Sequence, residues 1–370
     1  MVSISAGRSG ACGVLDDGGV ACWGAYDAYL ARLSDSDSSQ RLNLFPWRPP
    51  YPILAVAVRT EPAARVSGGQ YTLCVTGVDG RVLCRGDNWH ASLGLGEMGS
   101  VEDLTDLPSL RGAADVVMGG TLGVRVLCGL MPEGAVLCAG SNAEGLLGVG
   151  SAEMDVRRHA PVRGLPPAAQ LSIGDVHACA VDAAGAVWCW GKNDTLQLGR
   201  MDVPQSASPA AVRGVEGATA VAACERHSCA LLRDRTVVCW GDGATGQLGD
   251  GARGPAGGPR PVVGLVDVRQ LACGDQHTCA LRGDGTVACW GANGWGQATP
   301  DGADVVPSPA DVAGLSGARQ ITCGDQFSCA VRGDGSVLCW GDVDKYLVGS
   351  DPSQRQPDRP DVARVVRILR

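Results

Sequence analysis

The sequence has few large aromatic side chains and no long apolar run. Its 370 residues include 2 Phe and 5 Tyr, so a hydrophobic core must be built from Val, Leu, Ala, Cys and 9 Trp. No uninterrupted apolar segment reaches the roughly 18 residues that a transmembrane helix needs. Residues 1–7 lack the basic and apolar regions of a secretory leader. We therefore expect no membrane insertion, and either a cytosolic protein or a mature form without its leader.

Positive charge is also scarce. The chain has 31 Lys and Arg against 39 Asp and Glu, a formal net charge of -8. An acidic surface repels phosphate backbones, which disfavours nucleic acid as a partner. The sequence also lacks a His-Glu-x-x-His motif, a nucleophile elbow and a phosphate-binding loop. We therefore predict no metal and no cofactor, and we favour a protein that is not an enzyme.

Cysteine, by contrast, is abundant and periodic. Fourteen of the 17 cysteines form seven pairs in which the partners are ten residues apart. The pairs are Cys12 with Cys22, Cys74 with Cys84, Cys128 with Cys138, Cys179 with Cys189, Cys229 with Cys239, Cys279 with Cys289, and Cys329 with Cys339. Successive pairs follow one another at about fifty residues, a period typical of propeller blades or a solenoid.

The sixth repeat shows the structural unit. Short β-rich segments at 268–273, 277–281 and 286–290 are separated by turns, and a Pro-containing segment near 307–312 suits an edge strand. This pattern predicts an all-β, closed seven-bladed β-propeller with antiparallel blades of three to four strands. We expect one domain over 1–370, a loop insertion over 25–65, and N- and C-terminal strands that share the closing blade.

The turn at 283–285 fixes the register of the hairpin. It places Cys279 opposite Cys289, where paired Cβ atoms lie about 4.5–5.5 Å apart. We therefore expect seven cross-strand disulfides and an oxidising location, extracellular or in the periplasm or cell envelope. The alternative is fourteen reduced core cysteines in the cytoplasm. A Trp follows the second cysteine in five repeats, and we expect these indoles to pack between blades: Trp23, Trp190, Trp240, Trp290 and Trp340.

The string Cys-Gly-Asp-Gln-His-Thr-Cys-Ala-Leu-Arg-Gly-Asp-Gly-Thr-Val-Ala-Cys-Trp-Gly at 273–291, with Gly-Gln-Leu-Gly at 246–249, resembles the regulator of chromosome condensation repeat family. The resemblance spans nearly the whole chain and implies a seven-bladed propeller. Its members include exchange factors for small GTPases, a plant ultraviolet-B photoreceptor and a bacterial inhibitor of β-lactamases, so it leaves the function open. The paired cysteines are similar to a cysteine-rich bacterial branch that is often secreted.

Two sets of residues outside the pairs are candidates for chemistry. Cys224, Cys273 and Cys323 occupy matching first-strand positions in three blades. Sheets stack about 10 Å apart, whereas zinc–sulfur bonds are about 2.3 Å, so we expect buried free thiols. His177, His227 and His277 also recur, and we expect structural imidazoles that bond to the backbone.

The repeat is broken where the aromatic residues gather. The first insertion carries three of the five Tyr and both a Phe and a Trp, the loop of the second repeat adds a Trp and a His, and a later loop adds one more Trp. The predicted ligand-binding residues are Tyr26, Tyr29, Phe45, Trp47, Tyr51, Trp89, His90 and Trp295. Long loops on rigid scaffolds often carry function, and Tyr and Trp are common anchors of binding surfaces. The alternative is an insertion that folds its aromatics onto the blade edge.

These observations predict a non-catalytic, monomeric propeller that captures a protein or peptide through aromatic loops of blades 1 and 2. One alternative is an enzyme acting on a small molecule or peptide over the channel mouth, with His90 or Glu97 as the acid or base. Another is a purely structural module of the cell envelope.

Overall fold

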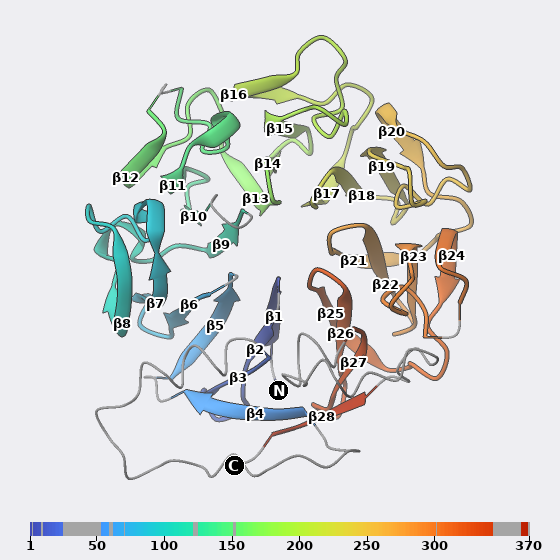
Figure 1. The fold of residues 1–370 in the computed structure, drawn as a ribbon, viewed down its shortest axis with the longest axis horizontal. Helices are drawn as coiled ribbons and strands as arrows, with labels where there is room; N and C mark the ends of the chain where they lie inside the picture. Colours follow the sequence, from blue (N-terminus) through green and yellow to red (C-terminus); the bar gives the residue numbers. More distant parts are fainter. Residues whose placement is uncertain are drawn as a thin grey trace.

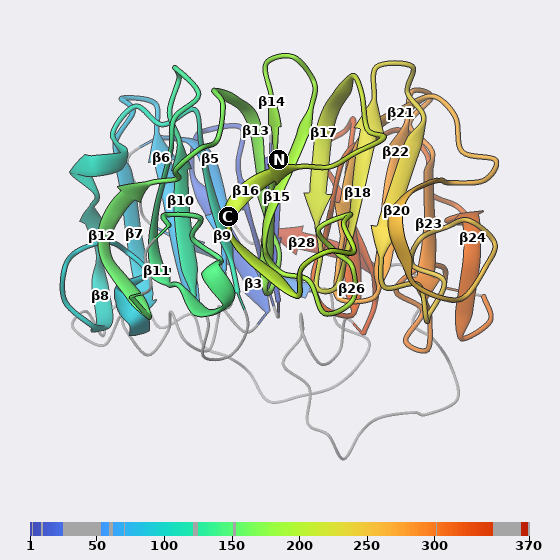
Figure 2. The same ribbon diagram turned by 90° about the horizontal axis from the view of Figure 1, so that it is seen from above.

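The strands form seven blades around a central axis (Figure 1). The computed structural model describes residues 1, 3–8, 10–24, 53–58, 62–69, 71–120, 125–150, 153–300, 302–342 and 364–368, with 53–58 and 364–368 as backbone only. Within these ranges each blade has four strands, which run along the ring axis in side view (Figure 2). The predicted fold class is confirmed.

Each blade is formed by one contiguous repeat, and its first strand lies nearest the axis. Blade 1 contains β1 (Ser3–Gly7), β2 (Gly10–Val14), β3 (Val20–Gly24) and β4 (Ile53–Val58). Blade 2 contains β5 (Ala63–Gly68), β6 (Thr72–Gly77), β7 (Val82–Asn88) and β8 (Gly99–Asp106). Blade 3 contains β9 (Asp115–Gly119), β10 (Val126–Leu130), β11 (Val136–Ser141) and β12 (Asp155–Pro161). Blade 4 contains β13 (Ala168–Ile173), β14 (His177–Asp182), β15 (Val187–Lys192) and β16 (Gln205–Ala211).

The remaining blades follow the same order. Blade 5 contains β17 (Ala218–Ala223), β18 (His227–Leu232), β19 (Val237–Gly241) and β20 (Ala256–Pro261). Blade 6 contains β21 (Val268–Cys273), β22 (His277–Arg282), β23 (Val287–Ala292) and β24 (Val305–Asp311). Blade 7 contains β25 (Ala318–Cys323), β26 (Phe327–Arg332), β27 (Val337–Gly341) and β28 (Arg364–Ile368). The described residues also contain three single-turn 3₁₀ helices, η2 (Trp89–Ala91), η3 (Pro108–Leu110) and η4 (Ala143–Gly145). None of the described helices is long and apolar enough to cross a bilayer.

The predicted hairpin register is confirmed. Cys279 lies opposite Cys289 and Leu281 opposite Val287, and the other six cysteine pairs have the same register. In each blade the first cysteine lies on the second strand and its partner on the third strand.

All seven of these cysteine pairs are disulfide-bonded, with Cα–Cα distances of 4.0–4.1 Å. The alternative of reduced core cysteines is therefore not what the structure shows. The bridges join Cys12 to Cys22, Cys74 to Cys84, Cys128 to Cys138, Cys179 to Cys189, Cys229 to Cys239, Cys279 to Cys289, and Cys329 to Cys339. Because the sulfurs lie directly across two paired strands, each bridge fixes the hairpin at the centre of its blade.

The repeat tryptophans pack between blades, as predicted. Trp23, Trp190, Trp240, Trp290 and Trp340 have no exposed surface. Trp240 and Trp290 each donate their indole N–H to a backbone oxygen of the preceding blade, at Gln197 and Gln247, with N–O distances of 2.9 Å. The large apolar rings fill the gap between neighbouring sheets, and in Trp240 and Trp290 this bond satisfies the one polar atom of the side chain.

Glutamines near the axis join several neighbouring blades. The Gln170 side chain accepts from the backbone N–H of Val221 at 2.9 Å and donates to its carbonyl at 3.1 Å. Gln270 makes the same two bonds to Ile321, and Gln320 makes them to Ile4. Blade 5 has Ala220 at this register position, so the glutamine contact is absent between blades 5 and 6.

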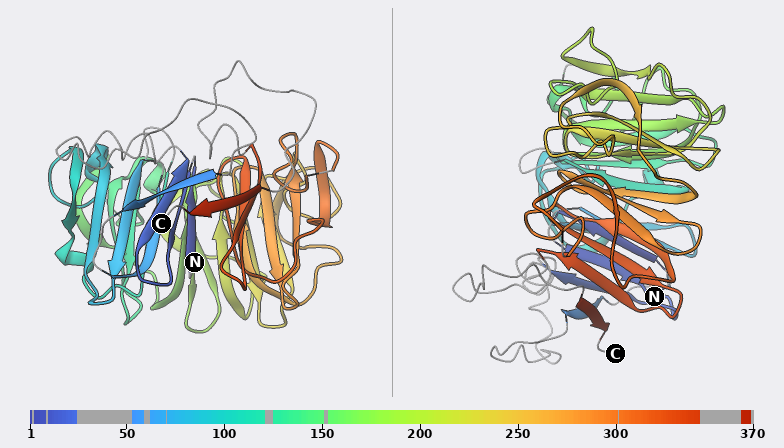
Figure 3. Two further views of the ribbon diagram at one scale, coloured as in Figure 1. Left: turned by 90° about the horizontal axis from the view of Figure 1, so that it is seen from below. Right: turned by 90° about the vertical axis from the view of Figure 1, so that its right-hand side faces the viewer.

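Blades 7 and 1 are neighbours, and the ring closes there in a way that the sequence did not predict. β28 pairs with β27 and, in parallel, with β4 at the outside of the ring (Figure 3). The first and last blades thus belong to one eight-stranded sheet. The expectation that the terminal strands share one blade is corrected: β1 is the inner strand of blade 1, whereas β28 is the outer strand of blade 7, because every repeat forms its own blade. The insertion over 25–65 stays a prediction, since most of it lies outside the described residues.

The recurrent histidines are structural, although their partners differ from those expected. His177, His227 and His277 are fully buried. Their Nε2 atoms lie 2.8–2.9 Å from the hydroxyls of Ser228, Thr278 and Ser328, respectively, each in the next blade. Burial lowers the pKa of all three imidazoles to about 3, so the rings are neutral. They bond side-chain hydroxyls, not the backbone.

Candidate functional site

One face of the ring is formed by the loops that follow the first and third strands of each blade. We call it the loop face. The two kinds of loop meet across blade boundaries: the Thr195 hydroxyl donates to the Arg226 carbonyl at 3.0 Å, and the Thr245 hydroxyl donates to the Gln276 carbonyl at 3.4 Å. The first-strand loops of blades 5 and 6 therefore support the third-strand loops of the blades before them.

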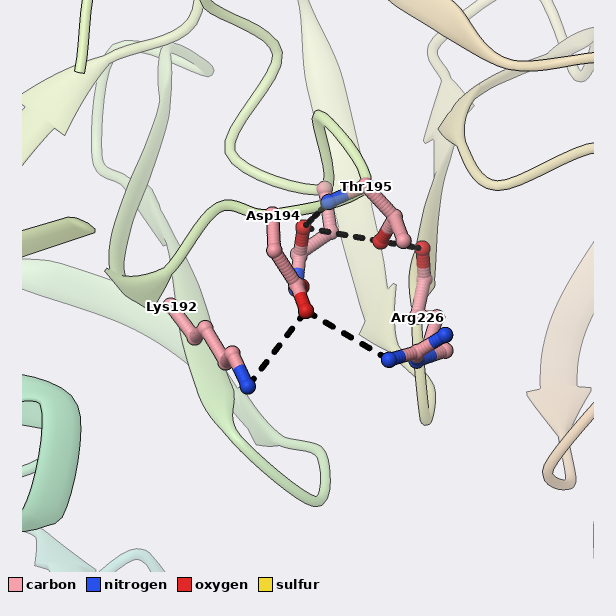
Figure 4. Close-up of polar contacts among 5 residues, drawn as sticks. Lys192, Asp194, Thr195 and Arg226 are labelled. Atoms are coloured by element: carbon pink, nitrogen blue, oxygen red, sulfur yellow. Dashed lines mark hydrogen bonds and ion pairs between the residues drawn. The ribbon is translucent and has the colours of Figure 1, made fainter. Parts of the chain in front are cut away.

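Figure 4 shows this support between blades 4 and 5. The Asp194 carboxylate lies 3.3 Å from Lys192 Nζ and 3.4 Å from a guanidinium nitrogen of Arg226. Hydrogen bonding from Gln197 and these cations lower the pKa of Asp194, despite the opposing effect of its burial. All three charged groups are partly exposed, so this cluster joins two loops but adds little to stability.

At the centre of the loop face, five charged side chains occupy one repeat position. The residue that follows the glycine or cysteine after the first strand is acidic in blades 4 to 7: Asp175, Glu225, Asp275 and Asp325. Blade 1 has Arg8 there instead. Equivalent positions of a ring converge on its axis, so the arginine of one blade faces the carboxylates of four others.

Arg8 binds three of these carboxylates. Its guanidinium nitrogens lie 3.0 Å from Asp175, 3.3 Å from Asp275 and 2.9 Å from Asp325. The side chain of Arg8 is 21% exposed, and those of Asp175 and Asp325 are 13% and 14% exposed. One arginine thus bridges blade 1 to blades 4, 6 and 7 across the axis.

The negative charge of this cluster exceeds its positive charge. Burial and repulsion from the other acids raise the pKa of Asp175 to about 7, against the attraction of Arg8. Burial also raises the pKa of Asp275 and Asp325, and for Asp325 repulsion from Asp275 adds to it. The pKa of Glu225 is raised for the same reasons, and its Oε2 is buried without a hydrogen-bond partner in the described part of the chain. Near neutral pH the mouth therefore holds both carboxylates and carboxylic acids.

The cluster borders a cavity of about 130 Å³ at the channel mouth. Glycines of six blades line much of it: Gly7, Gly68, Gly69, Gly119, Gly120, Gly174, Gly274 and Gly324. Side chains at several of these positions would collide with the next blade, since a Cβ on Gly174 would meet the Cys224 carbonyl and one on Gly324 the Gly7 carbonyl. The glycines thus let the inner strands approach closely, and the charged residues after them form the polar wall.

The structure brings together two of the predicted binding residues and separates a third. Trp89 and His90 lie in η2 of blade 2, whereas Trp295 lies in blade 6, on the opposite side of the ring (Figure 1). The indole of Trp89 is 57% exposed and that of Trp295 41%. The other predicted residues lie outside the described ranges: Tyr26, Tyr29, Phe45, Trp47 and Tyr51.

The blade-2 loop holds Trp89 at the surface. Asn88 fixes the loop, since its side chain accepts from the Leu93 N–H at 2.8 Å and donates to the Glu97 carbonyl at 2.7 Å. Asn193 bonds its own loop in the same way, so Trp89 stands where blade 4 has Asp194. Met98 in this loop and Met154 in the next blade are also exposed, at 43% and 69%. We call Trp89, Met98 and Met154 the blade-2/3 apolar patch.

His90 pairs with a carboxylate, as the enzyme alternative would require, but the pair does not line the channel mouth, where that alternative places its site. Its Nδ1 lies 2.8 Å from Asp155 Oδ1, and the two side chains are 33% and 23% exposed. Neither residue lines the channel-mouth cavity or the smaller cavity beside it. Glu97 is exposed. The pair instead joins the loop of Trp89 to the strand that follows Met154.

The unpaired cysteines correct the sequence prediction. Cys224 and Cys273 form a disulfide between blades 5 and 6, with Cα atoms 5.7 Å apart, and Cys323 is the free cysteine. Inner strands lie closer together at the axis than stacked sheets elsewhere, so the spacing argument failed. The positions also do not match: Cys273 lies opposite Thr278, but Ala223, not Cys224, occupies that register in blade 5. Cys224 stands at the glycine position, where a side chain points into the next blade.

Sequence reasoning missed the acidic mouth, although the repeat contains it. Aligning the residues that follow the first strands shows Asp or Glu in four blades and Arg8 in a fifth. Met98 and Met154 were also missed. Their loops could be aligned through Asn88 and Asn142, whose side chains both bond the carbonyl just before the methionine.

Comparison with known proteins agrees with this architecture. Residues 168–197, 218–247, 268–297 and 318–345 match the regulator of chromosome condensation (RCC1) repeat, and a second model of that repeat matches 184–231 and 236–281. The human E3 ubiquitin-protein ligase HERC2 is 29% identical over 155 residues, which are 41% of this chain and 3% of that protein. The Drosophila melanogaster regulator of chromosome condensation is 36% identical over 67 residues, 18% of this chain and 12% of that protein.

Solved structures show the same fold at low identity. Prp20p of Saccharomyces cerevisiae is 20% identical with a TM-score of 0.70, covering 83% of this chain and 77% of that one. Human WBSCR16 is 21% identical with a TM-score of 0.69, covering 82% and 84%. The chain spans a small fraction of the two curated relatives, and the structural likeness establishes the propeller alone.

Proposed function

Because this chain belongs to the proteins built of regulator of chromosome condensation (RCC1) repeats, we propose that it is a non-catalytic propeller that captures a protein or peptide on its loop face. Blade 2 supplies the main described anchor, and the aromatic residues of the blade-1 insertion are proposed to extend it. The ligand would bind to a monomeric ring.

The exposure of Trp89 is the observation that carries this proposal. The five repeat tryptophans have no exposed surface, whereas the Trp89 indole is 57% exposed. An exposed Trp beside two exposed methionines is costly in water and is typical of a protein-binding surface. The loop is held by Asn88 and by the His90–Asp155 pair, so binding would order few additional groups.

The charge of the channel mouth indicates the character of the ligand. Ser92 and Leu93, close after Trp89, line a small cavity that shares Gly69, Met118, Gly119 and Gly120 with the mouth. A segment seated on the blade-2/3 apolar patch could therefore extend to the acidic cluster, which favours Lys or Arg side chains. Related propellers bind proteins: yeast Prp20 was solved bound to Kap60, and Prp20p was described with its binding to Gsp1p and histones.

The test is selection of binding peptides from a random 12-residue display library. We expect the selected peptides to combine an apolar residue with Lys or Arg, and Trp89→Ala to weaken their binding by tenfold or more, since an anchor Trp contributes about 2 kcal/mol. Trp295→Ala is the matched control, because that exposed Trp lies on the opposite side of the ring. Equal affinity of wild type and Trp89→Ala would refute the proposal.

The disulfides support an oxidising compartment as part of the same proposal, extracellular or in the cell envelope. Sixteen of the 17 cysteines are bridged, a density typical of such compartments. Alkylation of unfolded, unreduced protein from its native source should modify one cysteine, Cys323. Modification of all 17 would place the protein in a reducing compartment.

A further inference from the structure

We propose that reduction of the Cys224–Cys273 bridge opens a zinc-binding site formed by the two thiolates and His227 at the channel mouth. This inference is independent of peptide capture. It concerns an eighth bridge that differs in position, surroundings and accessibility from the seven hairpin disulfides.

The geometry brings three ligand atoms together. Both sulfurs and a ring nitrogen of His227 lie within 4.8 Å of one another. Zinc bonds sulfur at about 2.3 Å and nitrogen at about 2.0 Å in tetrahedral sites, which separates two bound sulfurs by about 3.8 Å. Once the bridge is broken, the sulfurs need to move apart by less than the width of one atom. The Cα separation of 5.7 Å leaves room for that movement without a shift of the blades.

His227 is held in the orientation that a metal ligand needs. Its Nε2 lies 2.8 Å from the Thr278 hydroxyl, while its Nδ1 is buried and has no hydrogen-bond partner in the described part of the chain. In blade 6, a Cβ added to Gly274 would lie 2.8 Å from Nδ1 of His277. The Nδ1 edge therefore faces this repeat position, and in blade 5 the position is occupied by Cys224.

The bond to Thr278 completes the arrangement. When Nε2 donates its proton to that hydroxyl, the lone pair of Nδ1 remains free for a metal. Metal-binding histidines in proteins are commonly fixed in this way through their second nitrogen. A fully buried imidazole with one nitrogen bonded and the other directed at two sulfurs thus provides the third ligand.

Accessibility distinguishes this bridge from the others. Every cysteine of the seven hairpin pairs is at most 1% exposed. Cys224 and Cys273, in contrast, line the channel-mouth cavity together with Glu225, and Cys273 is half-buried. A small dithiol therefore reaches this bridge before it reaches the hairpins. The same opening leaves room for a water molecule as the fourth zinc ligand.

The chemistry balances with a dithiol as reductant. One of its thiolates attacks Cys273 Sγ, the sulfur–sulfur bond breaks, and Cys224 leaves as a thiolate that takes up a proton. The second thiol of the reductant attacks the mixed disulfide, which releases Cys273 and leaves the reductant as a cyclic disulfide. Zn²⁺ then binds both sulfurs, and their two thiol protons pass to solvent.

The neighbouring cluster of His277, Cys279 and Cys323 does not form an equivalent zinc site. Its atoms also lie within 4.8 Å, but Cys279 is bridged to Cys289 inside the hairpin, and burial raises the pKa of the Cys323 thiol to about 12. His277 thus provides a matched control. It has the same burial and the same bond to a hydroxyl as His227, but its Nδ1 edge faces Gly274, at the position where blade 5 has Cys224.

The experiment is zinc uptake by the full chain after limited dithiol reduction. Peptide mapping first establishes that Cys224 and Cys273 alone have been reduced. The protein is then equilibrated with Zn²⁺ alone, and bound metal is measured by mass spectrometry. We expect one zinc per reduced chain and none per oxidised chain. With Co²⁺ as the probe, a thiolate charge-transfer band and intense tetrahedral d–d bands should appear.

Variants separate this site from the other sulfurs. Cys224→Ser with Cys273→Ser should abolish uptake, and His227→Ala should weaken it by more than about tenfold, while His277→Ala should leave it unchanged. His227→Gln, whose amide can keep the bond to Thr278, replaces the alanine variant if that one does not fold. The site is refuted if the reduced chain takes up no zinc, if the double serine variant binds as much as wild type, or if His277→Ala loses as much affinity as His227→Ala.

Discussion

Blades 4 to 7 and blades 1 to 3 use the same fold with different regularity. Blades 4 to 7 each have a buried Trp after the second cysteine and an acid after the first strand: Trp190, Trp240, Trp290 and Trp340, with Asp175, Glu225, Asp275 and Asp325. Blades 2 and 3 have Arg85 and Ala139 at the Trp position, and blade 1 has Arg8 at the acid position. The exposed Trp89 and Met98 lie in blade 2.

This difference separates residues that pack between blades from residues whose side chains can contact a ligand. Where the repeat is regular, buried side chains bond a neighbouring blade, as Trp240 does at Gln197 in the preceding blade and His227 does at Thr278 in the next. Such residues hold neighbouring blades together and leave none of their own large side chains exposed at the surface. Where the repeat is broken, side chains such as Trp89 lie at the surface of a scaffold that is already stabilised. A binding surface can therefore be placed on blades 1 to 3 without weakening the ring.

The largest expected effect contrasts two tryptophans from the two regions. Trp240→Ala should lower the free energy of unfolding by about 3–5 kcal/mol, because it leaves a cavity between blades 4 and 5 and removes a buried hydrogen bond to the Gln197 carbonyl. Trp89→Ala should change it by less than about 0.5 kcal/mol, since that side chain is mostly in water. Urea unfolding of the oxidised protein measures both.

Two results would contradict the expected difference in stability between the Trp240→Ala and Trp89→Ala variants. A loss above about 1 kcal/mol for Trp89→Ala would mean that its indole packs on the blade and is not available to a ligand. A loss below about 1 kcal/mol for Trp240→Ala would mean that the seven hairpin disulfides hold the blades without inter-blade packing. Trp290→Ala, with the same burial and the same bond to a preceding-blade carbonyl, provides a second measurement in the regular region.

The regular region was predictable because its information is local and repeated. A ten-residue spacing around a three-residue turn fixes the pairing of Cys279 with Cys289, and seven occurrences of it indicate a ring. Small residues share a core cluster with the indoles, Ala180 with Trp190 and Ala230 with Trp240, which is consistent with inter-blade packing of the Trp side chains. The chemistry of each hairpin is contained in about twenty consecutive residues.

The mouth was not predictable in the same way, because its contacts join blades that are far apart in the chain. Arg8 and Asp175 are 167 residues apart, and nothing near either residue indicates the other. The bridge between Cys224 and Cys273 depends on how closely two inner strands approach the axis, which spacing along the chain does not give. Within its repeat, Cys224 lies one residue later than Cys273 does, at the glycine position, and this offset lets the two sulfurs meet.

A smaller effect is expected where the two regions meet, at Arg8. Arg8→Met removes the one cation that blade 1 directs at the acids of blades 4, 6 and 7. The pKa of Asp175 is about 7 in the folded protein, and those of Asp275 and Asp325 are also raised, against about 3.9 in an unfolded chain. These acids bind more protons when folded, so their contribution to stability is fully present below pH 4 and is lost as the pH rises through their folded pKa values.

Arg8 counteracts that loss by attracting the ionised carboxylates. Its removal should therefore cost about 1–3 kcal/mol at pH 8, above the folded pKa of Asp175 of about 7, and less at pH 5, below that pKa. Urea unfolding at the two pH values measures the difference, and Arg253→Met, at an exposed position, controls for the loss of a charge. An equal cost at both pH values would show that Arg8 acts by packing alone. A cost that grows with pH would show that the charge of Arg8 stabilises the ionised acids of blades 4, 6 and 7.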